Sequence, residues 1–180
     1  MRQKNTRRLA YLGVLTAAAL CLSWLESLLP LALPVPGAKL GLANIAVMIA
    51  LFTLGAGWAL TVMVLKCVLT SFLFGNFSSL LFSLFGGILS LGAMWLCRKF
   101  TGRFFSLLGV SVAGAAMHNT GQILAASLLA GSAAIFSYLP LLLLASVPLG
   151  ILTAFACYPV IRVLWQNRQR LGLKQSAFFH

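Results

Sequence analysis

Six long apolar stretches divide this chain of 180 residues and determine what it can fold into. They cover approximately residues 9–29, 40–54, 58–74, 80–97, 104–130 and 138–164. A helix of roughly 17–25 apolar residues spans the hydrocarbon core of a bilayer, and only the second stretch is clearly too short. We therefore predict an all-α fold, an integral membrane bundle of about six transmembrane helices that forms a single domain over residues 1–180.

The composition agrees with this fold class. Hydrophobic residues make up 61% of the chain and charged residues only 8%, whereas soluble domains have about 25% charged residues. A chain with so little polar surface cannot stay dissolved as a monomer, so a soluble domain is excluded.

Basic residues mark one side of the predicted bundle. Eleven of the thirteen flank apolar stretches, in three clusters: Arg2, Lys4, Arg7 and Arg8; Arg98, Lys99 and Arg103; Arg162, Arg168, Arg170 and Lys174. Four crossings separate the first two clusters and two crossings separate the last two, so all three lie on one side. The positive-inside rule makes that side cytoplasmic. Both termini are then inside, and residues 165–180 form a basic cytoplasmic tail.

This placement also bears on the partners of the chain. A net charge of +12 is compatible with nucleic-acid binding, but basic residues that flank apolar stretches are typical of topology signals and of contacts with lipid headgroups. We expect a multi-pass protein of the bacterial plasma membrane that contacts the lipid bilayer and binds no nucleic acid.

The connection between the first two stretches is rich in proline. Residues 30–39 hold three prolines and a glycine among mostly apolar residues, and proline interrupts a regular helix. Irregular backbone at membrane depth is tolerated only where protein buries it or where it lines a cavity. We interpret Pro34, Pro36 and Gly37 as part of a lid over a cavity, with a plain connector as the alternative.

Polar residues inside the apolar stretches are predicted to form a binding site, since ionisable groups at membrane depth are expensive and usually functional. They are Glu26, Lys39, Asn44, Lys66, His118, Asn119 and Gln122. With the topology above, they lie in the outer half or near the middle of the bundle, beneath the proline-rich connection. This placement predicts a pocket for a small compound that arrives from outside.

Structural roles stay open for several of these residues. Lys39 can snorkel to the interface, Glu26 can pair with Lys39, and the group around His118 can join helices through hydrogen bonds. Lys66 lies in the middle of the third stretch, where snorkelling is a long reach. We expect it to face the bundle interior and to bind an anionic group or to pair with Glu26.

Catalytic and cofactor motifs are missing from the sequence. The chain has no aspartate, one glutamate and two histidines, so paired carboxylates and a catalytic metal site are not expected. It has no GxxxxGK[ST] loop for ATP and no GxSxG or HExxH motif. We predict that the isolated chain has no enzymatic activity and holds no metal or cofactor.

Two motifs resemble the signatures of a known membrane family. They are Pro36-Gly37-Ala38-Lys39-Leu40-Gly41-Leu42-Ala43-Asn44-Ile45 and His118-Asn119-Thr120-Gly121-Gln122. Gly86-Gly87-Ile88-Leu89-Ser90 and Tyr138-Leu139-Pro140 fit as well. The family is labelled heptaprenyl diphosphate synthase component I, also called Gx transporters. The resemblance covers roughly residues 8–165.

This family in turn looks like the substrate-binding S components of energy-coupling factor (ECF) transporters, which are six-helix vitamin binders. The resemblance implies uptake of a small vitamin-like, anionic or isoprenoid compound. It also implies a membrane coupling subunit and ATPase subunits as partners, docked through small residues on the first helix. Gly13, Ala17 and Cys21 stand at the matching helical spacing, although the familiar alanine pair is not cleanly matched.

Two other functions stay open. A standalone secondary transporter would use Glu26 or His118 as a proton carrier. A membrane accessory subunit of polyprenyl diphosphate or quinone biosynthesis, or of electron transfer, would agree with the family label. In that case a partner would carry the catalysis, because this chain lacks the aspartates of prenyl diphosphate synthases.

Overall fold

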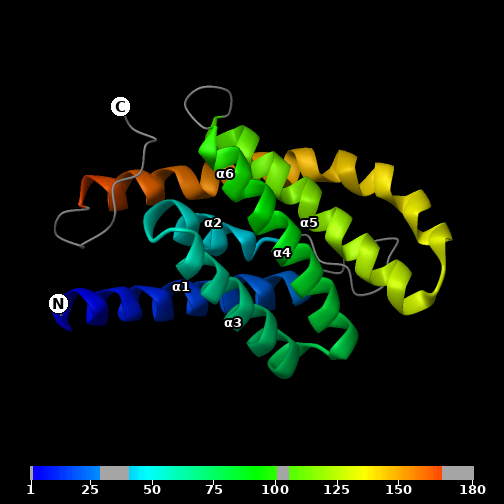
Figure 1. Ribbon diagram of the computed structural model, residues 1–180, viewed down its shortest axis with the longest axis horizontal. Coiled ribbons are helices and arrows are strands. Elements are labelled where there is room, and N and C mark those ends of the chain that lie inside the picture. Colours follow the sequence, from blue (N-terminus) through cyan, green and yellow to red (C-terminus); the bar gives the residue numbers. More distant parts are fainter. Residues whose placement is uncertain (1, 29–40, 101–105, 168–180) are drawn as a thin grey trace.

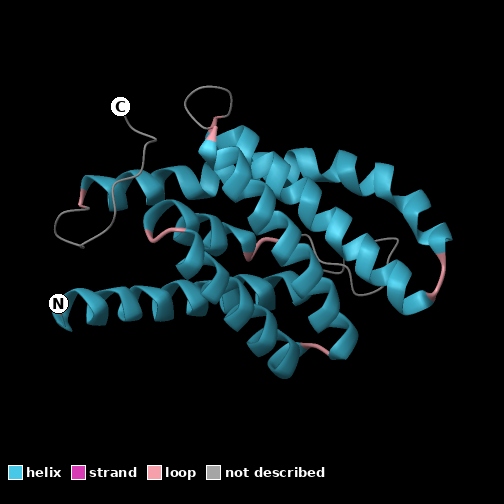
Figure 2. Cartoon of the chain, in the orientation of Figure 1, coloured by secondary structure: helices cyan, strands magenta, loops and turns pink. Residues whose placement is uncertain are grey.

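The computed structural model describes residues 2–28, 41–100 and 106–167, which form six α-helices and one short 3-10 helix (Figure 1). In chain order these elements are α1 (Arg2–Leu28), α2 (Asn44–Thr53), α3 (Ala56–Phe74), α4 (Phe77–Lys99), α5 (Leu107–Ala130), η1 (Ala133–Tyr138) and α6 (Leu139–Gln166). Figure 2 shows helices joined by short turns, and no strand occurs in the described ranges. The predicted all-α fold is confirmed.

Each predicted apolar stretch overlaps with one of these α-helices. Four helical segments are long and apolar enough to cross a membrane: Thr6–Leu28, Ala56–Phe74, Phe77–Lys99 and Ala133–Leu164. They indicate a membrane protein. The ten residues of α2 are too few to cross a bilayer, and α5 has polar residues in its middle. Six crossings with both termini in the cytoplasm therefore stay a prediction.

The start of α1 and the end of α6 lie toward the same end of the bundle (Figure 1). In Figure 1 the start of α1 and the end of α6 lie toward the left, whereas the α3–α4 turn and η1 lie toward the right. The described basic residues Arg7, Arg8 and Arg162 belong to the left ends. The turn around Asn76 and the segment of η1 carry no charge.

The short helix α2 lies at the centre of the bundle. It packs against α1, α3, α4 and α6, and nine of its ten residues are buried. Met48, Leu51 and Phe52 are among the most deeply buried side chains and belong to the main apolar core. A helix covered on all sides has no polar face, which explains why its sequence is almost entirely apolar.

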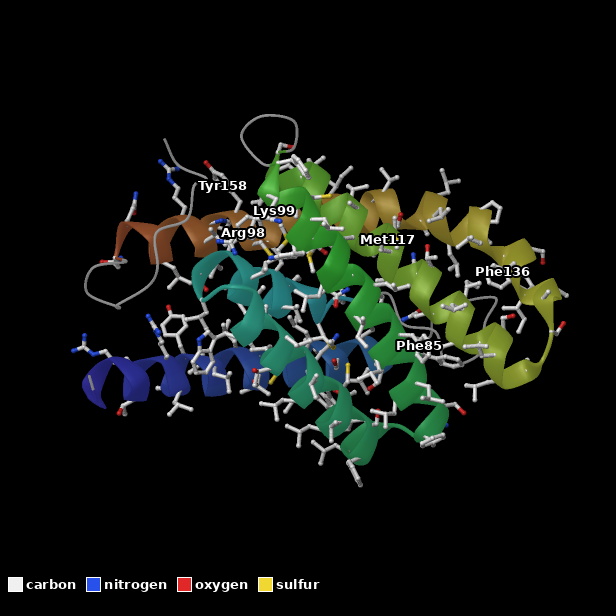
Figure 3. All side chains as sticks on the ribbon, in the orientation of Figure 1. Phe85, Arg98, Lys99, Met117, Phe136 and Tyr158 are labelled. Carbon is white, nitrogen blue, oxygen red and sulfur yellow. The ribbon has the colours of Figure 1, made fainter. Side chains whose placement is uncertain are left out.

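The outer faces of the longer helices carry large apolar side chains. Phe72, Phe155 and Leu144 are each more than two-thirds exposed. Figure 3 shows side chains that project outward along the bundle, with Phe136 and Tyr158 among them. Soluble monomers rarely expose so many large apolar side chains together, so this surface is suited to contact with lipid.

Glycines allow the closest helix contacts. α4 packs most extensively on α5, and α5 on α6. A Cβ atom at Gly121 would lie 2.5 Å from the carbonyl oxygen of Phe85 in α4, and one at Gly150 would lie 2.5 Å from Cα of Val112 in α5. Only glycine fits at these two contacts, as is typical of close helix pairs in membranes.

Replacing Gly121 with alanine is therefore expected to destabilise the bundle by about 1–3 kcal/mol, because the new Cβ would collide with the backbone of α4. Gly92→Ala is the matched control, since a Cβ atom there meets nothing within 4 Å and alanine is the better helix former. Thermal unfolding of the purified protein in detergent measures both. Equal midpoints for the two variants would contradict the close α4–α5 contact.

Candidate functional site

Buried polar side chains gather where α1, α3, α4 and α5 meet the start of α2. Glu26, Lys66 and His118 are 6%, 4% and 2% exposed, although each has an ionisable group. They come from three different helices, α1, α3 and α5. Such groups are costly to bury in a membrane protein, so their common location marks the candidate site.

Gly41 connects this cluster to α2. Its N–H donates to Oε1 of Glu26 at 2.7 Å, and its carbonyl accepts the N–H of Asn44 at 2.9 Å. Its φ of +87° lies in the left-handed region that favours glycine. The carboxylate of Glu26 thereby holds the turn from which α2 begins.

Lys66 joins α3 to the same turn. Its Nζ donates to Oδ1 of Asn44 at 3.4 Å, and both residues are buried. An ammonium group has three donors, and this bond uses one of them over a long distance. Lys66 thus lies inside the bundle, as the sequence predicted.

His118 is enclosed by two glycines. A Cβ atom at Gly41 would lie 2.9 Å from its Cδ2, and one at Gly86 would lie 2.8 Å from its Cε1 and Nδ1. Nε2 of Gln122, one turn further along α5, lies 2.9 Å from Nε2 of His118. The imidazole is held in one place by close packing and by this bond.

Asn119 has a different role. Its Nδ2 donates to the carbonyl oxygen of Leu142 in α6 at 2.8 Å. This bond joins α5 to α6, which is the interhelical role that the sequence left open for the group around His118. Within the motif that begins at His118, this residue and Gln122 therefore belong to the cluster, whereas Asn119 and Gly121 form contacts between helices.

Two small cavities share Gly41 in their walls. Each has a volume of about 10 Å³, which is about the room that one water molecule needs. The first is lined by Glu26, Lys66 and His118, together with Thr70 and Ser83. A larger, apolar cavity elsewhere in the bundle contains none of the predicted site residues.

The second cavity is lined by Asn44 and by hydroxyl groups. Ser90, Ser111 and Thr153 contribute from α4, α5 and α6. Oγ of Ser90 and Oγ of Ser111 are buried and have no hydrogen-bond partner in the described part of the chain. Buried hydroxyls normally have a partner, so this cavity is suited to a water molecule or to a polar group of a ligand.

The structure thus brings together most of the predicted site. Glu26, Asn44, Lys66 and His118 line one cavity or the other, and Gln122 contacts His118. Lys39, Pro34, Pro36 and Gly37 lie outside the described residues. Sequence reasoning missed the hydroxyl lining, namely Ser83, Ser90, Ser111, Thr70 and Thr153. One signal was available, because Ser83 and Ser90 stand seven residues apart around Gly86 and therefore share one face of α4.

The predicted docking residues lie on the outside of α1. Gly13, Ala17 and Cys21 are exposed, and Leu15 and Ala19 on the same helix are buried. The small-residue face is therefore not used for packing among the described helices. Within the same ranges no three potential metal-binding side chains of His, Cys, Asp or Glu lie together.

Comparison with known proteins identifies the family. The family described as heptaprenyl diphosphate synthase component I matches residues 15–158. The chain belongs to this family. No curated protein and no solved structure matches the chain. The family label names a component of a synthase, which implies partner subunits, and the expected likeness to ECF S components stays a prediction.

Replacing Gly86 with alanine should displace the imidazole of His118, because the new Cβ would lie 2.8 Å from two of its ring atoms. The chain has only two histidines, His118 and His180. NMR spectra of histidine-labelled protein in detergent should therefore show one shifted ring signal and one unchanged signal.

The matched control for this experiment is Gly57→Ala, since a Cβ atom at Gly57 meets nothing within 4 Å. It should leave both histidine signals in place. An unchanged His118 signal in Gly86→Ala would show that the imidazole does not lie between Gly41 and Gly86.

Proposed function

We propose that the chain is the substrate-binding membrane subunit of an ECF-type uptake transporter, and that it binds a small anionic compound at the cluster around Lys66. The observation that carries this proposal is the buried ammonium group of Lys66, which in the described part of the chain donates to the neutral amide of Asn44 at 3.4 Å. A buried charge without a charged partner is costly, and an anionic group of a ligand would offset that cost.

The second cavity supports a ligand with hydrogen-bonding groups. Asn44 contacts Lys66 and also lines the cavity that contains the unpartnered hydroxyls of Ser90 and Ser111. A ligand anchored by its anion at Lys66 would therefore find donors and acceptors close by. Each cavity now has room for about one water molecule, so binding requires the site to expand.

The proposed lid has its two ends at this site. Residues 29–40 connect α1 to the turn at Gly41, and Glu26 near the end of α1 accepts the N–H of Gly41 at 2.7 Å. Pro34, Pro36 and Gly37 belong to this segment, and a lid over the cluster is their proposed role. A rearrangement of this segment is how we expect the site to open toward the outer side.

The exposed face of α1 is the proposed contact with the coupling subunit. Gly13, Ala17 and Cys21 have no large side chain that would keep another helix at a distance. ATP hydrolysis would take place on the partner ATPases, since this chain has no nucleotide-binding loop. The proposed location is the bacterial plasma membrane.

Removing the polar groups at Lys66 and Asn44 should abolish ligand retention. We expect native mass spectrometry of protein purified from its own membrane to detect a bound small molecule in the wild type. The double variant Lys66→Ala/Asn44→Ala should lose it, because both the charge and the amide that positions the charge are gone.

The control for this experiment is Leu69→Ala, an exposed position on the same helix, which should retain the molecule. Thermal unfolding of both variants establishes that they are folded. An unchanged bound mass in the folded double variant would show that this cluster is not the binding site.

Replacing Ala17 with tryptophan should prevent assembly with the coupling subunit and ATPases, because a large ring would hold the partner helix away from α1. Leu144→Trp is the control, since Leu144 is 71% exposed on a different helix, α6. Affinity purification from the native membrane, followed by a test for ATPase subunits, measures the effect. Equal recovery of these subunits with both variants would exclude this face as the docking surface.

The family label favours a second candidate function, that of an accessory subunit of a prenyl diphosphate synthase. In that case the purified complex would contain a soluble synthase and no ATPase, and the Lys66/Asn44 double variant would retain its partner. The same affinity purification therefore distinguishes the two functions.

A further inference from the structure

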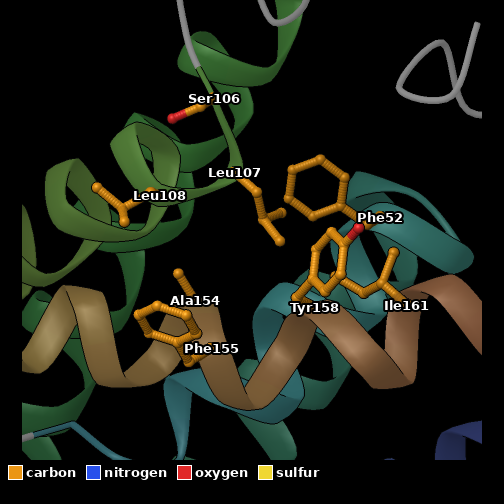
Figure 4. A pocket seen from close by; sticks show the side chains of 8 residues that line it. All are labelled: Phe52, Ser106, Leu107, Leu108, Ala154, Phe155, Tyr158 and Ile161. Carbon is orange, nitrogen blue, oxygen red and sulfur yellow. The ribbon is translucent and has the colours of Figure 1, made fainter.

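An apolar pocket of about 490 Å³ lies between α2, α5 and α6 (Figure 4). Phe52, Ala154 and Ile161 line it and are buried, at 1%, 5% and 2% exposure. Phe155 and Tyr158 are 71% and 47% exposed and form its rim. The pocket therefore opens at the outer surface of the bundle, and its interior is suited to a hydrocarbon chain.

The surface around the pocket is apolar and therefore suited to contact with lipid. Leu152, Val147 and Leu144 continue the exposed apolar face of α6 beyond Phe155. Ser106 in the lining is already engaged, because its Oγ accepts the N–H of Gly109 at the start of α5. A molecule that enters from this side is therefore taken from the bilayer and meets almost no polar group inside the pocket.

A basic side chain lies next to the pocket wall. The guanidinium carbon of Arg98 is 5.3 Å from the centroid of the Phe52 ring, and Phe52 lines the pocket. Arg98 Nη1 donates to the carbonyl oxygen of Leu51. A guanidinium group has five N–H donors in a fork that matches phosphate. Arg98 is partly exposed, so donors remain for an anion at the surface.

The chain itself has almost nothing to neutralise this charge. It has thirteen basic residues and a single acidic side chain, Glu26. Glu26 accepts the N–H of Gly41, before the start of α2, whereas Arg98 contacts Leu51, near the end of α2. In a membrane, the phosphates of lipid headgroups are the anions available to a basic residue such as Arg98.

We propose that this pocket is a specific site for an anionic phospholipid, with an acyl chain between α2, α5 and α6 and the phosphate at Arg98. The pocket and Arg98 together make the site specific, since the pocket selects an acyl chain and the guanidinium group selects a negatively charged headgroup. This site is separate from the polar cluster and does not depend on the proposed transport function.

The test uses the full chain purified in detergent, with phosphatidylglycerol, phosphatidylcholine of the same acyl chains, and inorganic phosphate as probes. Phosphatidylglycerol at about a hundred times its Kd should raise Tm by roughly 5–10 °C. Phosphatidylcholine should raise Tm much less, because it carries no net charge, and inorganic phosphate should not raise it. Native mass spectrometry should detect one phosphatidylglycerol molecule that persists after delipidation of the surface.

Two variants separate the chain from the headgroup. Ala154→Phe fills the pocket, and Arg98→Gln removes the charge. Each should abolish the rise in Tm with phosphatidylglycerol, measured from that variant's own lipid-free Tm. Leu152→Phe and Lys99→Gln are the matched controls, because Leu152 is 54% exposed and is not part of the pocket lining, and Lys99 lies over the Trp95 ring. Both controls should keep the rise.

Several results would overturn the proposal. They are an equal rise in Tm with the two lipids, a rise in Tm reproduced by inorganic phosphate alone, and a full rise in Tm with phosphatidylglycerol in folded Ala154→Phe. If Ala154→Phe does not fold, Leu108→Trp at the 42% exposed rim takes its place, and an undiminished shift there has the same meaning.

Discussion

A short helix in the middle of a membrane bundle has backbone groups at both ends that water cannot reach. An α-helix leaves four N–H groups and four carbonyl groups without partners inside the helix, and in a bilayer each of these costs several kcal/mol if it stays unsatisfied. Arg98 meets part of that need at the end of α2, and Glu26 holds the turn that precedes its start. Glu26 accepts the N–H of Gly41 in the turn before α2, and Arg98 donates to the carbonyl oxygen of Leu51 near its end. The remaining helices pack around the segment that these two residues hold in place.

The sequence predicted the helices because the length of an apolar stretch is a strong signal. It predicted Glu26, Lys66 and His118 as candidate site residues because ionisable groups are rare inside apolar stretches. It could not assign the hydroxyl lining. A serine or threonine in an apolar helix often donates to its own backbone, as Thr53 does to the carbonyl of Ile49. Whether Ser90 and Ser111 do so depends on the neighbouring helices, and that information is not local. The polar side chain of Asn119 favours a place in the site, and only the tertiary structure shows its bond to α6.

The imbalance of charge has consequences at both ends of the bundle. The chain has one acidic side chain and thirteen basic ones, and the acidic one accepts a hydrogen bond from a backbone N–H. External anions are therefore the natural partners of the basic side chains that the chain itself cannot pair. Near the end of α2 the natural source is the headgroup of a lipid, because the surface there faces the bilayer. At the cluster around Lys66 lipid has no access through the described helices, so a soluble anion is the reasonable partner.

A purely structural role explains Glu26 and Arg98 better than it explains Lys66. The first two satisfy backbone groups of the central segment, and replacing either would leave a buried amide or carbonyl unpaired. Lys66 instead donates to a side chain, Asn44, over 3.4 Å. A leucine at position 66 and an alanine at 44 would remove this pair and leave no backbone group unsatisfied, and buried ion or polar pairs are often replaced by apolar residues without loss of stability. A buried ammonium group that satisfies no backbone group, beside a cavity with unpartnered hydroxyls, supports the proposed ligand.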